Sequence, residues 1–232
     1  MSSVTTATPL AEYLEQAGSD ANPAFVSYLA NLQQVAGVNP TIAHNIVQEL
    51  EDQRNDLKLI ASENFTSLAT QATMGNLLTD KYAEGFPGSR FYAGCDNVDD
   101  LETEACQQAC KLFGADHAYV QPHSGADANL IAFWAILQAR VGVPSLEELG
   151  ETNPAKLSRE DWNKVRHAMG NQRMLGLDYY SGGHLTHGYR QNVAAQFFDS
   201  YGYAVSKETG LLDYDDLEKQ AEEVNPFILL AG

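Results

Sequence analysis

The sequence predicts an α/β fold with a mainly parallel sheet, preceded by a helical arm. Its 232 residues are 44% apolar and 19% charged, which is ordinary for a globular protein with a core. Amphipathic helical patterns fill the first part of the chain, and beyond Gly94 helical patterns alternate with short apolar runs. Alternation at this spacing is typical of parallel strands joined through helices.

The N-terminal arm (residues 1–56) is expected to be helical and to serve dimerisation. Amphipathic runs such as residues 25–35 predict two short helices within the first 40 residues. From Thr41 to Leu57 apolar residues recur at helical spacing, and Thr41 is placed to cap the first turn. The apolar stripe of this helix needs a partner surface.

Residues 57–232 are expected to form part of a larger domain. A helix from Asn97 or Asp99 through Phe113 comes first, and Gly114 is suited to end it. The following elements are a strand at 118–120, a helix at 126–138, strands at 173–177 and 203–206, a helix at 216–224 and a strand at 227–231.

Residues 141–171 do not fit this alternation. Pro144 and Pro154 interrupt the segment, and Ser158 is placed to begin a short helix that reaches Met169. Because surface loops tolerate added length at small cost, we expect an insertion on the surface with no catalytic role.

Composition excludes several classes of protein. The formal charge of −17, from 31 acidic and 14 basic residues, disfavours a nucleic-acid partner. Residues 1–9 lack the features of a secretory signal, and no apolar stretch approaches the roughly 20 residues of a membrane span. Three cysteines give neither a disulfide framework nor a four-ligand zinc site. We expect a cytoplasmic protein with no membrane partner and no metal site.

Two segments are candidates for ligand binding. Residues 181–188 (SGGHLTHG) combine three glycines with two histidines, which leaves a bare backbone around imidazole and suits a flat ligand. Plain tight turns and metal loops can have the same pattern. Residues 123–126 follow a predicted strand and open a predicted helix, so their N–H groups and the Ser124 hydroxyl could bind an anion. A routine helix cap would look the same.

Four segments in one order resemble serine hydroxymethyltransferase: LIASENFTS at 59–67, KYAEGFPGSRFYAGC at 81–95, QPHSGADAN at 121–129 and the histidine segment at 181–188. The resemblance extends from about Leu57 to Gly232. It implies a fold-type I pyridoxal-phosphate-dependent transferase of one-carbon metabolism, with residues 57–232 as a partial large domain. The implied reaction transfers the serine hydroxymethyl group to tetrahydrofolate, the co-substrate, and yields glycine and 5,10-methylenetetrahydrofolate. A homodimer with shared active sites is also implied.

The resemblance assigns cofactor contacts to both candidate segments. Ser124, Gly125 and Ala126 match the positions that hold the cofactor phosphate, although Ala126 stands where many relatives carry serine. His184 matches the histidine that stacks on the pyridine ring, which orients the breaking bond for catalysis. The neighbouring Gly183 and Leu185 match the loop that contacts folate.

The resemblance also assigns roles in the second and first segments. Tyr82 and Tyr92 match tyrosines that contact the phosphate and the substrate. Glu84 matches a glutamate near the serine hydroxyl and folate, where it can exchange a proton. These residues are expected to enter the site of the neighbouring subunit. Ser62 matches a contact to the substrate carboxylate.

No lysine of the chain stands in the Thr-Thr-His-Lys context expected for the Schiff base; the lysines are Lys58, Lys81, Lys111, Lys156, Lys164, Lys207 and Lys219. We therefore expect the N-terminal part of such an enzyme, as a truncated or separate fragment, inactive alone. A folate-independent β-hydroxy amino acid aldolase and a non-catalytic fragment that binds a full-length subunit are the alternatives. The presence of Gly183, Leu185 and Glu84 favours the folate-dependent transferase over the aldolase.

Overall fold

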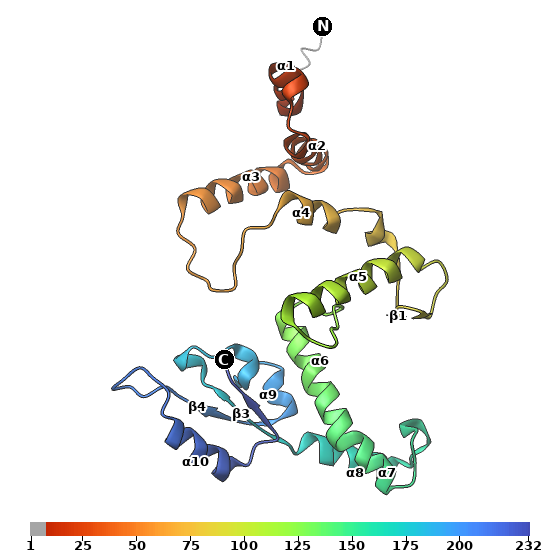
Figure 1. Cartoon of the computed structure of the whole chain (residues 1–232), viewed down its shortest axis with the longest axis vertical. Coiled ribbons are helices and arrows are strands. Elements are labelled where there is room, and N and C mark those ends of the chain that lie inside the picture. The colour runs from red at the N-terminus through yellow and green to blue at the C-terminus, as the bar shows by residue number, and fades with distance from the viewer. Residues whose placement is uncertain (1–7) are drawn as a thin grey trace. The chain divides into compact units, whose positions relative to one another are not determined.

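The computed structural model describes residues 8–232, and the chain divides into two compact units, Met1–Thr103 and Glu104–Gly232. The boundary falls inside helix α5, Asp96–Phe113 (Figure 1). This division differs from the expected boundary after residue 56, which stays a prediction about domain organisation. The first seven residues, which hold most of the Ser/Thr-rich start, lie outside the described part.

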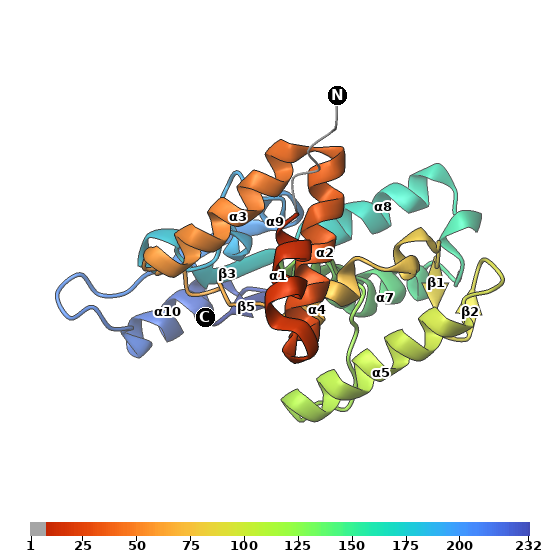
Figure 2. The ribbon, with the colours of Figure 1, turned by 90° about the horizontal axis from the view of Figure 1, so that it is seen from above.

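Three helices begin the first unit: α1 (Pro9–Ala17), α2 (Pro23–Val38) and α3 (Pro40–Asn55), with a 3₁₀ turn at Gly18–Asp20 after α1 (Figure 2). Each starts at a proline, whose missing N–H is no loss in the first turn. The two helices expected before residue 40 are confirmed, although α2 is a full 16 residues long. The expected cap at Thr41 is wrong. The Asn39 side chain caps α3 instead, because Pro40 begins the helix earlier.

The rest of the first unit holds α4 (Leu68–Met74), a 3₁₀ turn at Leu77–Asp80, and an antiparallel hairpin of β1 (Gly85–Phe86) and β2 (Ser89–Arg90). Gly85 has a φ of 108°, and a side chain there would collide with the carbonyl oxygen of Ser89. Only glycine can therefore start this tight hairpin without strain.

Helix α5 ends as expected, at Gly114 with a φ of 62°. Its expected start at Asn97 or Asp99 is wrong, because the helix already begins at Asp96. The Asp99 carboxylate accepts hydrogen bonds from the Gly88 N–H and from Arg90, and so it is used to hold the hairpin.

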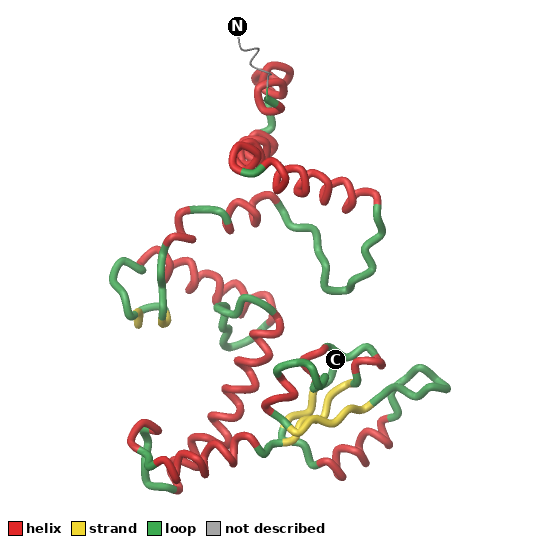
Figure 3. Tube along the Cα trace, turned by 180° about the vertical axis from the view of Figure 1, so that it is seen from behind, coloured by secondary structure: helices red, strands yellow, loops and turns green. Residues whose placement is uncertain are grey.

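The second unit contains a parallel sheet of three strands in the order β4-β3-β5: β3 (Arg173–Leu177), β4 (Asp199–Tyr203) and β5 (Ile228–Leu230). These strands are the yellow segments near the C-terminus in Figure 3. The central strand β3 has the expected bounds, and β5 lies within its expected range. Strand β4 lies upstream of the expected 203–206, because its pairing with β3 ends at Tyr203 opposite Leu177. The expected strand at 118–120 is wrong, since that segment forms no ladder with the described strands.

The helices of the second unit are α6 (Gly125–Leu137), a π-helical turn (Gln138–Gly142), α7 (Val143–Glu148), a 3₁₀ turn (Pro154–Lys156), α8 (Arg159–Gly170), α9 (Ala194–Phe197) and α10 (Tyr214–Val224). Two further 3₁₀ turns, Tyr179–Ser181 and Leu185–His187, follow β3. Helix α10 runs beside the sheet and contacts β3 and β4 (Figure 1). The expected helices at 126–138 and 216–224 are confirmed with small shifts at their ends.

The expected insertion is only partly a surface element. Ser158 does cap α8, with its Oγ accepting from the Asp161 N–H. However, Leu146, Val165 and Met169 are buried in one cluster. Its other buried members are Phe133, Leu137, Met174, Ala194, Phe198 and Ile228. The expectation that 141–171 lies on the surface is therefore wrong for α7 and α8, which help to form the core of the second unit.

One helical run among residues 8–232, Gly125–Glu148, is long and apolar enough to cross a membrane by length and composition. This differs from the expectation that no segment reaches such a length. Phe133, Leu137 and Leu146 of this run are buried in the core of the second unit. Packing within the protein therefore accounts for part of its apolar character.

Candidate functional site

The N-terminus of α6 presents backbone N–H groups at an accessible position. The Ser124 Oγ accepts from the Asp127 N–H at 3.1 Å, so the hydroxyl acts as the helix cap. Ser124 and Gly125 are exposed, and a side-chain carbon at Gly125 would meet no atom within 4 Å. Open space therefore lies beside Gly125 at the positive end of this helix, where an anion is favoured.

The histidine segment follows the carboxyl end of β3, the central strand. Gly182 has a φ of 98°, which turns the chain back after the 3₁₀ turn at Tyr179–Ser181. The next residue, Gly183, is buried, and its N–H donates to the Asp178 carbonyl at 3.0 Å. Any side chain at Gly183 would collide with the backbone carbonyl of Leu177. The structure thus gives Gly183 a packing role, while the neighbouring Leu185 is partly exposed.

Hydrogen bonds link the histidine segment to α6. Asn129, one helical turn after Gly125, donates from Nδ2 to the Thr186 Oγ1 at 2.6 Å. The Thr186 Oγ1 lies 2.8 Å from the His184 Nδ1, and the Thr186 N–H donates to the same Nδ1 at 3.2 Å. His184 itself is exposed. The structure therefore brings the ring of His184 near the first turns of the helix that begins at Ser124.

A hollow of about 400 Å³ lies beside His184, lined in part by Asp178, Tyr179, His187, Tyr189 and Tyr201. The His187 Nδ1 is buried and has no hydrogen-bond partner among the described residues. Burial lowers the pKa of His187, and the neighbouring His184 adds to the effect, while a hydrogen bond with the Leu177 backbone opposes it. His187 therefore lies in the wall of this hollow with a lowered pKa, which favours its neutral form.

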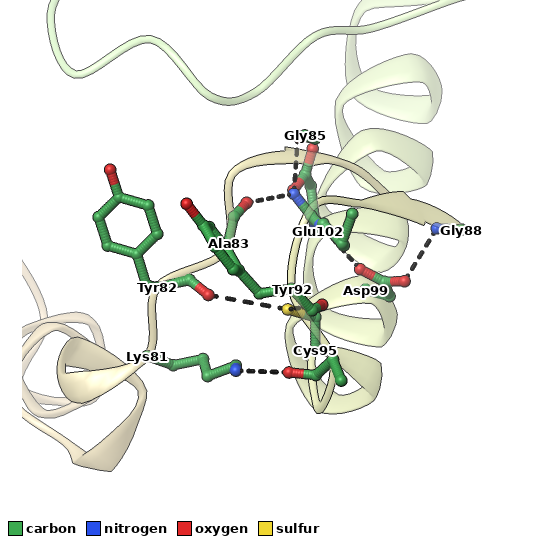
Figure 4. Close-up of polar contacts among 11 residues, drawn as sticks. Lys81, Tyr82, Ala83, Gly85, Gly88, Tyr92, Cys95, Asp99 and Glu102 are labelled. Carbon is green, nitrogen blue, oxygen red and sulfur yellow. Dashed lines mark hydrogen bonds and ion pairs between the residues drawn. The ribbon is translucent and has the colours of Figure 1, made fainter.

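A second set of candidate residues lies in the first unit. The Tyr92 hydroxyl donates to the Glu84 Oε2 at 3.2 Å, and the rings of Tyr82 and Tyr92 meet edge to face at 5.3 Å between centroids. The Cys95 Sγ contacts the carbonyl oxygens of Tyr82 and Tyr92, and the Lys81 Nζ donates to the Ala93 carbonyl (Figure 4). Tyr82, Glu84 and Tyr92 thus lie close together in one loop, whose two sides are joined by these contacts.

Arg90 holds this loop in shape, a role that the sequence pattern did not predict. Its side chain is 5% exposed and pairs with Asp99 at 2.7 Å and Glu102 at 2.6 Å. It also donates to the carbonyl oxygens of Ala83 and Gly85. The hydrogen bond with Glu102, followed by that with Asp99, raises the pKa of Arg90. The hydrogen bond from the Gly88 N–H is the largest cause of the lowered pKa of Asp99. The sequence did contain one indication of this role. Asp99 and Glu102 stand three positions apart on a predicted helix, so both carboxylates lie on the same helix face.

The expected site residues therefore form two groups. Ser124, Gly125, Ala126, His184 and their neighbours lie in the second unit, whereas Tyr82, Glu84 and Tyr92 lie in the first. Ser62 is exposed in the loop between α3 and α4. In the part of the chain that the structure describes, no group of three His, Cys, Asp or Glu side chains is arranged to hold a metal ion.

The parallel sheet, with an open helix N-terminus and a histidine loop beside it, is typical of an α/β ligand-binding protein, because ligands of such folds bind at the carboxyl ends of the strands. The model of the serine hydroxymethyltransferase family matches residues 35–149 and 164–232. The chain belongs to this family. Two stretches lie outside the match, residues 1–34 and residues 150–163, and the second of these lies inside the segment expected to be an insertion.

Proteins named serine hydroxymethyltransferase are similar over most of the chain. That of Treponema pallidum is 63% identical over 209 residues, which are 90% of this chain and 36% of the relative. That of Mycolicibacterium smegmatis is 51% identical over 216 residues, 93% of this chain and 44% of the relative. That of Cutibacterium acnes is 50% identical over 206 residues, which are 89% of this chain and 42% of the relative. The chain thus spans well under half the length of these relatives.

Proposed function

We propose that this chain supplies part of the active site of a pyridoxal-phosphate-dependent serine hydroxymethyltransferase with a fold-type I large domain. The reaction would move the hydroxymethyl group of serine to tetrahydrofolate and leave glycine. One observation carries the proposal: hydrogen bonds connect Asn129 of α6, through Thr186, to the ring of His184. In a chain of this family, they connect the helix whose N-terminus would bind the cofactor phosphate to the residue that would stack on the cofactor ring.

The residues of the second unit fit pyridoxal phosphate. The phosphate would lie at the N-terminus of α6, where Gly125 leaves open space and the helix end favours negative charge. Ala126 offers a backbone N–H but no hydroxyl. The exposed ring of His184 would cover one face of the pyridine ring. When bound, the cofactor supplies an electron-accepting ring that stabilises negative charge on the substrate Cα.

The residues of the first unit would act on the substrate. Glu84 would take and return the proton of the serine hydroxyl. The hydrogen bond from the Tyr92 hydroxyl orients its carboxylate. Tyr92 and Ser62 would orient serine, and Tyr82 would reach the cofactor phosphate. The contacts of Arg90 fix the loop that carries Glu84, so its position does not depend on the substrate.

A cytoplasmic homodimer with shared active sites would provide both groups. Helix α3 exposes an apolar stripe in which Ile42 is 51% and Leu50 is 45% exposed. Burial of such a stripe favours association. We propose that a second copy of the protein covers it, with Glu84 of one subunit serving the cofactor of the other.

Serine cleavage by the full-length gene product tests the proposal. Purified protein would be supplied with pyridoxal phosphate and serine, with and without tetrahydrofolate, and glycine would be measured. Folate-dependent glycine formation supports the transferase. Equal rates of β-hydroxy amino acid cleavage without folate would indicate the aldolase instead. Absence of both activities in folded, cofactor-loaded protein would contradict the proposed function.

The 232-residue chain can be tested separately. None of its lysines lines the hollow beside His184, and Lys81 is engaged with the Ala93 carbonyl. We therefore expect borohydride reduction after incubation with pyridoxal phosphate to label no single lysine stoichiometrically. Peptide mapping that found one fully labelled lysine would show that the Schiff-base residue lies within residues 1–232.

A further inference from the structure

A buried hydroxyl joins α6 to the ring of His184. Thr186 has no solvent exposure, and among the described residues it is the one buried residue with a polar side chain. Its Oγ1 lies 2.6 Å from the Asn129 Nδ2 and 2.8 Å from the His184 Nδ1. A buried hydroxyl must be satisfied by such partners, since an unmade hydrogen bond is costly there.

The chemistry of the three groups sets the direction of this chain of hydrogen bonds. The Asn129 amide nitrogen can only donate, so the Thr186 Oγ1 accepts from it. The Nδ1 of His184 accepts from the Thr186 backbone N–H and therefore carries no proton, so the Thr186 hydroxyl proton is the one that lies between Oγ1 and Nδ1. The Thr186 backbone N–H can only donate, and it points to the same Nδ1 at 3.2 Å. Two donors therefore meet the Nδ1 lone pair, and the second does not depend on the orientation of the Asn129 amide.

We infer that Asn129 and Thr186 are positioning residues that hold His184 as a neutral imidazole with its proton on Nε2. The identity of the flat ligand rests on the proposed function, whereas the protonation pattern does not. The Nδ1 lone pair is occupied, so this atom does not act as a base toward substrate. His184 acts through the face of its ring and through the Nε2–H.

The position of Asn129 gives this arrangement a second consequence. Asn129 lies on α6 one turn after Gly125, about 6 Å along the helix axis. The same helix therefore provides the N-terminus at which the phosphate would bind and, through Asn129, the contact that fixes the ring plane of His184. The distance between phosphate and stacking ring is set before the ligand binds, which lowers the ordering cost of binding.

The test is the protonation pattern of His184 in the full-length gene product without cofactor. Protein labelled with ¹⁵N-histidine would be measured near neutral pH by long-range ¹H–¹⁵N correlation, and the His184 signals identified by their loss in His184→Gln. We expect a protonated Nε2 and an unprotonated, hydrogen-bonded Nδ1. A dominant Nδ1–H form in the parent protein would overturn the inference.

Two pairs of variants test the residues themselves. Thr186→Val removes the hydroxyl and Thr186→Ser keeps it. Asn129→Asp removes a donor, whereas Asn192→Asp is the matched control, because the Asn192 Oδ1 only accepts, from the Ala194 N–H. We expect the Nδ1–H form to rise in Thr186→Val and Asn129→Asp, and to stay at the parent level in Thr186→Ser and Asn192→Asp.

Affinity for pyridoxal phosphate supplies an independent readout. It should weaken about three- to tenfold in Thr186→Val and Asn129→Asp, the loss expected for one hydrogen bond. Unchanged spectra and affinity in both variants would refute the positioning role. If Thr186→Val does not fold, the parent, Thr186→Ser and Asn129→Asp spectra still decide. If the expected pattern is found in a protein without serine hydroxymethyltransferase activity, the proposed function fails and the inference about His184 stands.

Discussion

Replacement of Met169 by alanine tests whether α8 is part of the core. The Met169 side chain is 5% exposed and packs in the cluster with Phe133, Leu137 and Val165. Its sulfur also lies 3.9 Å from the Gln138 amide nitrogen, in the π-helical turn that follows α6. If residues 141–171 were a surface addition, truncation of this side chain would have little effect.

The expected loss follows from the burial. A buried Met→Ala change removes transfer free energy and leaves a cavity, which together lower the free energy of unfolding by about 2–5 kcal/mol. A domain of this size has about 5–15 kcal/mol in total, so the change removes a large share. At about 2–4 °C per kcal/mol, the melting temperature should fall by about 4–20 °C. Met74→Ala is the control, because Met74 is 65% exposed and should change stability by about 0.5 kcal/mol or less.

Tryptophan fluorescence during urea unfolding gives the measurement. Both tryptophans of the protein, Trp134 on α6 and Trp162 on α8, lie in the second unit and report its unfolding. The two compact units can unfold separately, so a probe confined to one of them is needed. A midpoint for Met169→Ala equal to that of the parent protein would refute the packing of α8 against α6.

Three further predictions concern the candidate site. His184→Ala in the full-length gene product should weaken pyridoxal phosphate binding and slow serine turnover with an unchanged circular dichroism spectrum, because an exposed ring contributes little to packing; parent values of both would exclude the stacking role. Glu84→Gln should slow folate-dependent serine cleavage by about a hundredfold or more with cofactor binding retained, since it keeps the hydrogen-bond acceptor for Tyr92 but cannot exchange a proton. Full activity of that variant would remove Glu84 from the mechanism. His187 has a lowered pKa in the folded state, so the unfolded state takes up a proton first as the pH falls through about 6.5, and folding stability should decrease there. Denaturation at several pH values should show this decrease to be smaller in His187→Gln, and equal slopes for the two proteins would contradict it.

The sequence by itself determined the family and the features that depend on neighbouring residues. Four ordered segments identified the family, and helix ends such as Ser124 before α6 and Gly114 after α5 were correctly placed. A cap or a left-handed glycine acts within a few residues of the chain, so its signal is local. The apolar runs of β3 and β5 likewise predicted these two strands from local sequence.

The tertiary structure decided what depends on residues far apart in the chain. The apolar run at 118–120 pairs with none of the described strands, so the strand predicted there from local pattern does not form. The end of β4 is set by its register with β3, so local pattern placed this strand too far along the chain. Burial of Met169, the contacts of Arg90 and the link from Asn129 through Thr186 each join segments separated in sequence. A single side chain does not specify its distant partner. Such pairings arise only when the whole chain packs, because burial and strand pairing are collective properties of the fold.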